Sequence, residues 1–111
     1  MLDREFFLGF IKVHILYHAS KEPVFGVEIA KELGRHGYHL GPGTLYPTLH
    51  RLEEKGYLES SSKVVGGKVR KYYTITEQGL KVLNEARAKI RELVDEVFED
   101  GNAAEPSVKG P

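Results

Sequence analysis

Side chains able to bind an extended anion are concentrated in two neighbouring segments of the chain. In residues 43–55, polar residues lie between leucines. The candidates for ligand contact in this segment are Thr44, Tyr46, Pro47, Thr48, His50 and Arg51. Between Ser60 and Thr76 no acidic residue occurs, and the charged residues are Lys63, Lys68, Arg70 and Lys71. A local cluster of cations attracts polyanions even when the total charge is neutral. The two segments therefore predict a surface that binds a polyanion.

The charge of the whole chain hides this cluster, because 16 basic and 16 acidic residues give a formal net charge of zero. Residues 1–76 hold 11 Lys and Arg against 8 Asp and Glu, and all five histidines lie there. Residues 77–111 hold 5 Lys and Arg against 8 Asp and Glu. The first part is therefore net basic and the second net acidic.

Other chemistries have weaker support in the residue types. The chain has no cysteine, which excludes disulfides, thiolate zinc sites, iron–sulfur clusters and a cysteine nucleophile. His14 and His18 have a helical spacing that could chelate zinc or nickel in a metal-dependent sensor or hydrolase, but a metal site needs further ligands, so packing or solvation is the favoured interpretation. The sequence places no general base near the serines at 60–62, so these are interpreted as hairpin surface rather than as a catalytic nucleophile. We expect no enzymatic activity, no cofactor and no metal.

The length of 111 residues leaves room for one compact domain. No stretch approaches 18 apolar residues, and no charged-then-apolar leader opens the sequence. We therefore expect a cytoplasmic protein without a membrane partner.

Two helices are predicted at the start of the chain. Residues 3–19 form a helix with Asp3 as N-cap and a broad apolar face made of Phe6, Phe7, Phe10, Ile11, Ile15 and Leu16. After a proline-containing connection, residues 25–33 form a short helix whose end is marked by Gly34 and Gly37. Its apolar residues at spacings of three and four are Phe25, Ile29, Ala30 and Leu33.

A third helix is predicted to follow a turn and to end near residue 55. Thr44 is its expected N-cap, which puts Pro47 at the third helical position, where a backbone donor is not needed. Gly56 is its expected C-cap. The buried stripe of this helix consists of Leu45, Leu49 and Leu52.

The next segment changes from helical to strand-like patterning. Residues 57–63 and 69–75 are rich in β-branched and aromatic residues and flank Gly66-Gly67, a two-residue hairpin signal. Neighbouring residues of a strand point to opposite faces. Tyr72 and Tyr73 are therefore expected to lie on opposite faces of the second strand.

A long helix is predicted from Thr76, its N-cap, to residue 99. Apolar residues at alternating spacings of three and four are typical of paired helices, and a body this small cannot cover all of them. We favour pairing of this helix with a second copy of the chain. The alternative is that the helix folds back onto its own domain. The predicted dimerisation residues of the first and last helices are Phe7, Phe10, Ile11, Leu83, Ala86, Ile90, Leu93 and Val97. Residues 100–111 are small and polar and are expected to be disordered.

Three helices followed by a basic hairpin are the order of a winged helix-turn-helix domain, a mainly α fold with a small β-hairpin (α+β). Residues 1–76 would form the DNA-binding domain, and residues 77–99 the dimerisation helix. The leucine stripe turns the opposite face of helix 43–55 toward a DNA major groove. His50 and Arg51 are the preferred base or phosphate contacts there. The hairpin, or wing, at residues 60–72 would bind the backbone or the minor groove.

A second hypothesis keeps this fold and changes its partner. The domain would then be a protein-interaction adaptor whose hairpin meets an acidic protein, with no DNA binding. The two hypotheses differ in one simple property, since an adaptor retains no DNA even at low salt.

Several motifs in this order resemble the PadR-like family of transcriptional regulators. The most specific is Gly43-Thr44-Leu45-Tyr46-Pro47 followed by Leu49-His50-Arg51-Leu52-Glu53. Arg70-Lys71-Tyr72-Tyr73-Thr74-Ile75-Thr76 with Gly79 follows it, and Phe25-Gly26-Val27-Glu28-Ile29 precedes it. The resemblance covers about residues 5–98.

This resemblance implies a homodimeric transcriptional repressor that binds a palindromic operator in double-stranded DNA through two winged helices. It also implies dimerisation by the C-terminal helix, and burial of Tyr73 with Ile75 while Tyr72 is more exposed. Small apolar or phenolic compounds relieve repression in some relatives, which implies a small apolar effector at the dimer interface. The chain matches the shorter members of the family, and it has no Trp, the residue that some drug-binding relatives place between subunits.

Overall fold

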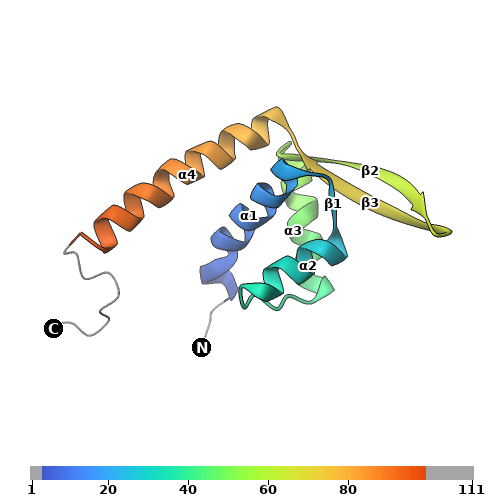
Figure 1. The fold of residues 1–111 in the computed structure, drawn as a ribbon, viewed down its shortest axis with the longest axis horizontal. Coiled ribbons are helices and arrows are strands. Elements are labelled where there is room, and N and C mark those ends of the chain that lie inside the picture. The colour runs from blue at the N-terminus through green and yellow to red at the C-terminus, as the bar shows by residue number, and fades with distance from the viewer. Residues whose placement is uncertain (1–3, 100–111) are drawn as a thin grey trace.

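The computed structural model describes residues 4–99 and contains four helices and a small sheet in that range (Figure 1). The elements in chain order are α1 (Arg4–Lys21), β1 (Val24–Phe25), α2 (Gly26–Arg35), α3 (Pro42–Glu54), β2 (Leu58–Val65), β3 (Lys68–Ile75) and α4 (Glu77–Val97). This order confirms the mainly α winged-helix prediction. The Asp3 cap and the tail at 100–111 lie outside the described residues.

A glycine directly follows the C-cap of α2 and of α3, since Gly37 follows His36 and Gly56 follows Lys55. The predictions were wrong in two details: Gly34 lies inside α2, and Gly56 is one residue beyond the C-cap. Gly37 and Gly56 adopt φ values of +88° and +83°, which residues with a Cβ rarely tolerate. Beyond each glycine the backbone turns back, so that Tyr38 N–H donates to the Leu33 carbonyl at 2.9 Å and Tyr57 N–H donates to the Leu52 carbonyl at 3.0 Å. These two ends fix the directions in which the chain leaves α2 and α3.

The start of α3 differs from the prediction. Gly41 is the N-cap and Pro42 is the first helical residue, so Thr44 is not the cap. Proline is favoured at that first position because its φ already suits a helix and no backbone donor is required. Pro47 therefore lies inside the helix. The Thr48 hydroxyl donates to the Thr44 carbonyl at 2.7 Å, one turn back.

The three strands form an antiparallel sheet in the order β1-β3-β2. The two-residue strand β1, which the sequence pattern predicted as connection and helix start, pairs Val24 with Tyr73 and Phe25 with Tyr72. The β2–β3 hairpin turns at Gly66-Gly67, where both φ values are positive. Tyr73 is buried and Tyr72 is half-buried, as the resemblance implied, but Ile75, which was expected to be buried with Tyr73, is only half-buried.

The core lies where α1, α2, α3 and the base of the hairpin meet the first turns of α4. Its fully buried side chains are Ile11, Ile15, Ile29, Leu33, Leu49, Leu58 and Leu83. Ile11 and Leu83 were predicted to contact a second copy. Because each is only 1% exposed within its own chain, both belong to the domain core instead.

The helix α4 begins at a tight joint with the loop after α3. Thr76 caps the helix by accepting from Gly79 N–H at 2.9 Å, and its hydroxyl donates to the Gly56 carbonyl at 2.5 Å. A Cβ on Gly79 would overlap the Tyr57 carbonyl oxygen, so only glycine permits this approach. From this joint α4 runs out of the body as an arm (Figure 1). Within residues 4–99 no helix combines the length and apolar character needed to cross a bilayer.

Candidate nucleic-acid interface

The outer face of α3 presents most of the predicted contact residues. Leu45, Leu49 and Leu52 are buried, and this turns Tyr46, Pro47, His50 and Arg51 to the exposed side. Thr44 is half-buried. The prediction that Thr48 contacts DNA is wrong, because its side chain is 3% exposed and its hydroxyl bonds within the helix.

Tyr46 combines exposure with a packing role. Its side chain is 46% exposed, yet a Cβ on Gly26 would lie 2.6 Å from the Tyr46 hydroxyl oxygen. The ring thus packs directly on the backbone at the start of α2. Tyr46 holds α2 and α3 together and still leaves part of its ring at the surface.

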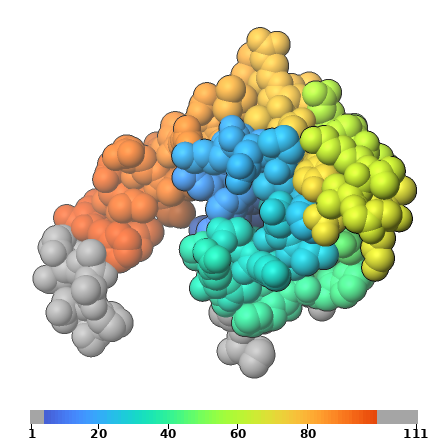
Figure 2. All heavy atoms as spheres, turned by 45° about the vertical axis from the view of Figure 1, so that its right-hand side comes forward, coloured from blue at the N-terminus to red at the C-terminus, as the bar shows by residue number. Residues whose placement is uncertain are grey.

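A groove of about 620 Å³ separates α3 from the hairpin. We call it the reading groove. The groove is lined by side chains from α2, α3 and β3, which include Val27 and Lys31 of α2, Tyr46 and His50 of α3, and Val69, Arg70 and Lys71 of β3. Figure 2 shows the hairpin beside α2 on one side of the molecule, with α4 projecting from the other.

Lys31 is a cation that the sequence pattern did not single out. It lies in α2 and lines the reading groove with the exposed residues of α3. The sequence contains a signal for this position. Ile29 and Leu33 are four residues apart and lie on the buried face of the helix, so Lys31, midway between them, lies on the exposed face. The groove thus draws its basic residues from both α2 and β3.

The wing carries its cations on exposed strands. Lys63 and Arg70 are cross-strand partners. The Arg70 guanidinium carbon lies 4.6 Å from the centre of the Phe25 ring, and Lys63 Nζ lies 5.5 Å from the centre of the Tyr72 ring. Cations over aromatic faces are attracted by the ring quadrupole, so these contacts orient both side chains on the strands of the wing.

Lys71 differs from the other three cations of the wing. Its Nζ lies 3.7 Å from Glu53 Oε1, and the Ser60 hydroxyl donates to Glu53 Oε2 at 2.6 Å. One carboxylate of α3 thus connects to both strands of the hairpin. Lys71 is partly neutralised there, so its first role is to fix the wing against α3.

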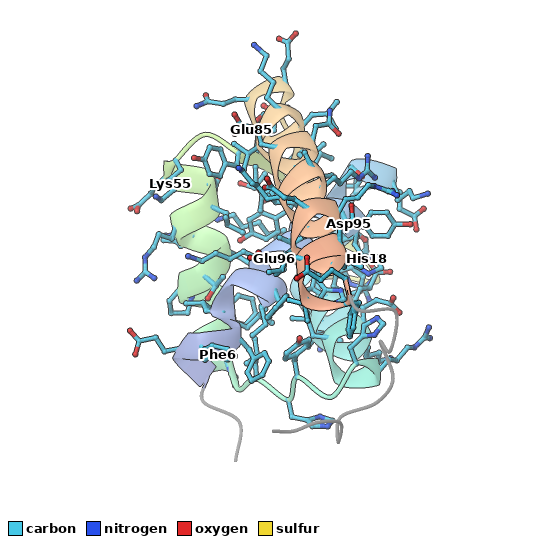
Figure 3. All side chains as sticks on the ribbon, turned by 90° about the vertical axis from the view of Figure 1, so that its left-hand side faces the viewer. Phe6, His18, Lys55, Glu85, Asp95 and Glu96 are labelled. Atoms are coloured by element: carbon cyan, nitrogen blue, oxygen red, sulfur yellow. The ribbon has the colours of Figure 1, made fainter. Side chains whose placement is uncertain are left out.

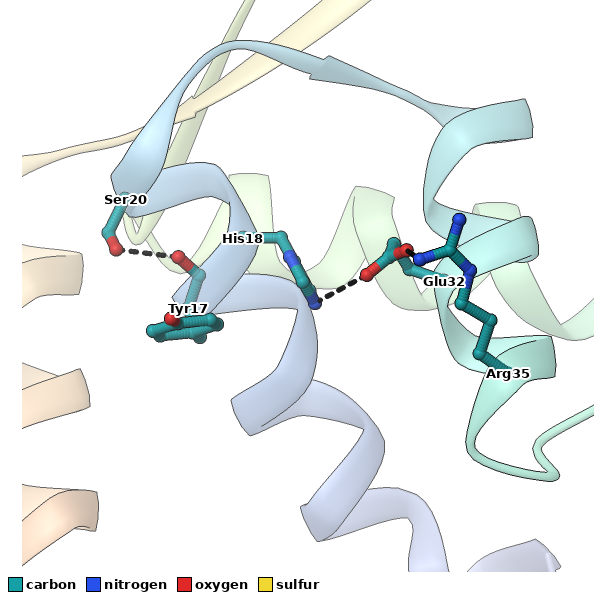
Figure 4. Close-up of polar contacts among 5 residues, drawn as sticks. All are labelled: Tyr17, His18, Ser20, Glu32 and Arg35. Atoms are coloured by element: carbon teal, nitrogen blue, oxygen red, sulfur yellow. Dashed lines mark hydrogen bonds and ion pairs between the residues drawn. The ribbon is translucent and has the colours of Figure 1, made fainter.

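The histidines of α1 have separate partners rather than a common ligand. His14 stacks on His36 with ring centres 4.6 Å apart, and burial together with this neighbour lowers the His14 pKa. His18 Nε2 lies 3.4 Å from Glu32, which also pairs with Arg35 at 3.0 Å (Figure 4). Among residues 4–99 no three His, Asp or Glu side chains are grouped to hold a metal ion. The geometry supports packing rather than metal binding.

The outer half of α4 carries an uncovered apolar stripe. Its residues are exposed and comprise Ile90, Leu93, Val94, Val97 and Phe98. The same stripe begins at Leu83, which is buried, and continues through Ala86, which is half-buried. The stripe is therefore covered by its own domain only near the joint.

A second uncovered stripe runs along α1. Phe6 is 71% exposed, Phe10 and Tyr17 are also exposed, and Phe7 is half-buried between Phe6, Phe10 and Tyr38. Figure 3 looks onto this side, with α4 in front of α1 and Phe6 at the uncovered end of α1. The two helices contact each other, so the two stripes lie on neighbouring parts of the surface.

Comparison with known proteins identifies the family to which this chain is similar. The model of the transcriptional regulator PadR-like family matches residues 15–85. The transcriptional regulator Rv3488 of Mycobacterium tuberculosis is 48% identical over 95 residues, which cover 86% of this chain and 89% of that protein. A PadR family regulator from Eggerthella lenta has 37% identity and a TM-score of 0.75 over 88% of this chain and 87% of its own. A PadR-like regulator from Bacillus cereus has 31% identity and a TM-score of 0.79 over 88% and 97%.

Proposed function

This chain belongs to the PadR-like family of transcriptional regulators, and from that premise we propose that it is a homodimeric repressor of a palindromic operator. The observation that carries the proposal is the reading groove. It joins an exposed helix face to a cationic hairpin, with Lys31, His50 and Lys71 all lining one concave surface.

The recognition helix α3 would read the major groove. His50 and Arg51 are exposed on its outer face, and an arginine can bond both O6 and N7 of one guanine. Tyr46 and Pro47 would contact the sugar–phosphate edge beside them. Thr44, half-buried near the helix start, would contribute at the same edge.

The wing would bind the DNA backbone next to this site. Lys63, Lys68 and Arg70 are exposed, and no acidic residue interrupts them in the hairpin. Contacts from such side chains to phosphates supply affinity without sequence preference and make binding depend on salt. Lys31 would add a further phosphate contact from the other wall of the reading groove.

The dimer would form through the two apolar stripes. The exposed half of α4, with Ile90, Leu93 and Val97, is left uncovered by the rest of residues 4–99. Each such side chain gains about 1.5–3 kcal/mol when it is buried. A second copy supplies a matching surface, because a two-fold interface uses the same stripe on both chains together with Phe6 and Phe10 of α1.

Two copies related by a two-fold axis would present two α3 helices to DNA. Half-sites on one side of a duplex are separated by about one turn, roughly 34–36 Å. The operator is therefore proposed to be palindromic. A small apolar effector would bind between the α1 and α4 stripes of the two copies, and it would act by favouring a different spacing of the two wings.

The proposal is tested by selecting duplexes from random-sequence DNA with the purified wild-type protein. We expect a palindrome to emerge, with half-sites one helical turn apart, and we expect affinity to fall steeply as salt rises from 50 to about 200 mM. Retention of no DNA at low salt would contradict the proposal and favour the adaptor hypothesis. Selection of a single, non-repeated half-site would contradict the dimeric part.

A further inference from the structure

Two histidine rings from different elements lie against each other at the edge of the α1 stripe. His14 of α1 and His36, the C-cap of α2, stack with ring centres 4.6 Å apart and planes inclined by 26°. His14 is half-buried and His36 is exposed. Two neutral imidazole rings can share such a contact, whereas two charged rings repel each other at this distance. The stack is therefore a contact that weakens as the pH falls into the range where histidine becomes charged.

The histidine pair borders the apolar surface that is proposed to meet a second copy. His14 follows Phe10 by four residues and precedes Tyr17 by three, so the three side chains occupy neighbouring positions on α1. Phe10 and Tyr17 are 45% and 37% exposed. A second copy that covers these two rings would also remove His14 further from water. Such burial disfavours the charged form of a histidine.

A continuous row of aromatic rings joins the histidine pair to the other end of the same stripe. The centre of the His14 ring lies 5.6 Å from that of Tyr38, and the Tyr38 ring lies 6.2 Å from that of Phe7. The Phe7 ring in turn lies 4.8 Å from Phe6 and 5.7 Å from Phe10. A displaced His14 ring would therefore remove a support from Tyr38, and through it from the exposed phenylalanines.

The groups around the pair do not favour its charged form. The titratable neighbours of His14 come from α1, from α2 and from the turn after α2, and they are His18, Glu32, His36 and Tyr38. Burial, His36 and His18 lower the His14 pKa, and Glu32 acts in the opposite direction. The Glu32 carboxylate, however, is shared with His18 at 3.4 Å and Arg35 at 3.0 Å (Figure 4). Once charged, the two stacked rings would lie among more cations than anions.

We propose that the stacked pair of His14 and His36 makes dimerisation depend on pH, so that the dimer forms when both rings are neutral and dissociates as they become charged. The inference rests on the proposed function, since it needs the α1 stripe to lie in the dimer interface. A dimer that buries His14 further holds fewer protons than two separate chains, so its dissociation constant rises as pH falls. Each chain of a two-fold dimer contributes one such pair, which doubles the effect in free energy.

The test measures the dimer dissociation constant of the full chain by sedimentation equilibrium at pH 7.5 and at about pH 5.5, at one ionic strength. For the wild type we expect a rise of roughly fivefold at the lower pH. The rise should be absent in His14→Phe, which keeps an aromatic ring in the contact but cannot become charged. His36→Gln removes the neighbouring charge and leaves His14 in place, so it should show a smaller rise than the wild type.

His39→Gln is the matched control, because His39 is an exposed histidine in the same connection between α2 and α3. It should keep the pH dependence of the wild type, and melting temperatures at both pH values show that each variant is folded. Equal dissociation constants of the wild type at the two pH values, an undiminished rise in His14→Phe, or loss of the rise in His39→Gln would each overturn the inference. A wild-type protein that is monomeric at pH 7.5 would instead overturn the proposed function.

Discussion

Two parts of this molecule project from the body, and they differ in what their surfaces can bind. The β2–β3 wing exposes cations on one face and a valine pair at its tip, whereas the outer half of α4 exposes a stripe of large aliphatic residues. Cations without acidic neighbours point to a polyanion, and an aliphatic stripe points to a protein surface of the same kind. The difference supports the proposal that one projection binds DNA and the other binds a second copy.

Both projections start from one joint. The Gly56 carbonyl and the Tyr57 carbonyl lie where the chain leaves α3 for the wing, and Thr76 and Gly79 lie where it leaves the wing for α4. In the proposed dimer, a rigid joint would make the separation of the two wings depend on how the two α4 helices pair. A variant at the joint should therefore affect both projections, whereas a variant in the wing or in α4 should affect one of them.

The largest effect is expected from Gly79→Ala. The added Cβ would meet the Tyr57 carbonyl oxygen, a backbone atom that cannot turn aside, so we expect a loss of about 3 kcal/mol in the free energy of unfolding. Chemical denaturation measures this. Gly9→Ala is the control, because nothing lies within 4 Å of its Cβ on α1, and it should stabilise the protein slightly. Equal stability of the two variants would contradict the close joint.

The next effect concerns the α4 projection. The double variant Ile90→Gln and Leu93→Gln removes two apolar side chains from each half of the proposed interface, at about 1.5–3 kcal/mol per buried side chain. We expect the dimer dissociation constant to rise at least about hundredfold, as measured by sedimentation equilibrium. Lys89→Gln is the control and should leave dimerisation intact. The Lys89 side chain is 81% exposed and pairs with Glu92 on the same helix. A dimer unaffected by the double variant would place the interface elsewhere.

A smaller effect on DNA affinity is expected from single variants in the wing and in α3, which should differ in their dependence on salt and on base sequence. Lys68→Gln and Arg70→Gln should weaken binding to all sequences and reduce the slope of log affinity against log salt by about 0.9 for each phosphate that is no longer neutralised. Arg51→Ala should instead relax base preference by about 1–3 kcal/mol at one position. Binding to selected and unrelated duplexes at several salt concentrations distinguishes the two. A change of base preference in the wing variants alone would reverse the assignment.

A still smaller effect is expected from Glu53→Gln. The amide can still accept from Ser60, but the ion pair with Lys71 is removed. Because the pair is partly exposed, we expect a change in stability below about 1 kcal/mol. Lys71 would be free for a phosphate, so the salt dependence of DNA binding should become steeper. Glu59→Gln, on an exposed residue of β2, is the control, and an equal change in both variants would argue against the role of Lys71.

The smallest effect concerns pH and the body beneath both projections. Burial and the neighbouring His36 lower the His14 pKa below its ordinary value of 6.5. The folded state therefore disfavours the charged form, and stability should fall as pH drops from about 6.5 toward the lowered pKa. In His14→Gln this part of the acid loss should be absent. Melting temperatures of both proteins between pH 7.5 and about 5.5 check this, and parallel curves would contradict it.

The sequence was sufficient to predict the helices, the hairpin and the position of the exposed α3 face. Periodic leucines, the Gly66-Gly67 turn and the Thr76 cap are local signals, and each corresponds to an element in the structure. The strand β1 has only two residues and exists through its pairing with β3. A pattern that depends on a partner so distant along the chain gives no local signal.

The site residues were predicted less completely for a similar reason. Spacing places Thr48, Ile11 and Leu83 on helices but does not say which edge of an apolar face meets the core, and all three are buried. The outward orientation of Lys31 follows from its spacing, but its place in the same groove as α3 depends on how α2 packs beside α3. The pairing of Lys71 with Glu53 likewise arises only in the folded chain.

The proposed dimer holds two α3 helices on one duplex, and the mass of the protein–DNA complex reports the number of bound chains. Native mass spectrometry on the selected duplex should give two chains per duplex for the wild type, at concentrations just sufficient for binding. One chain per duplex, with wild-type sequence preference and no dimer in solution at those concentrations, would contradict the account.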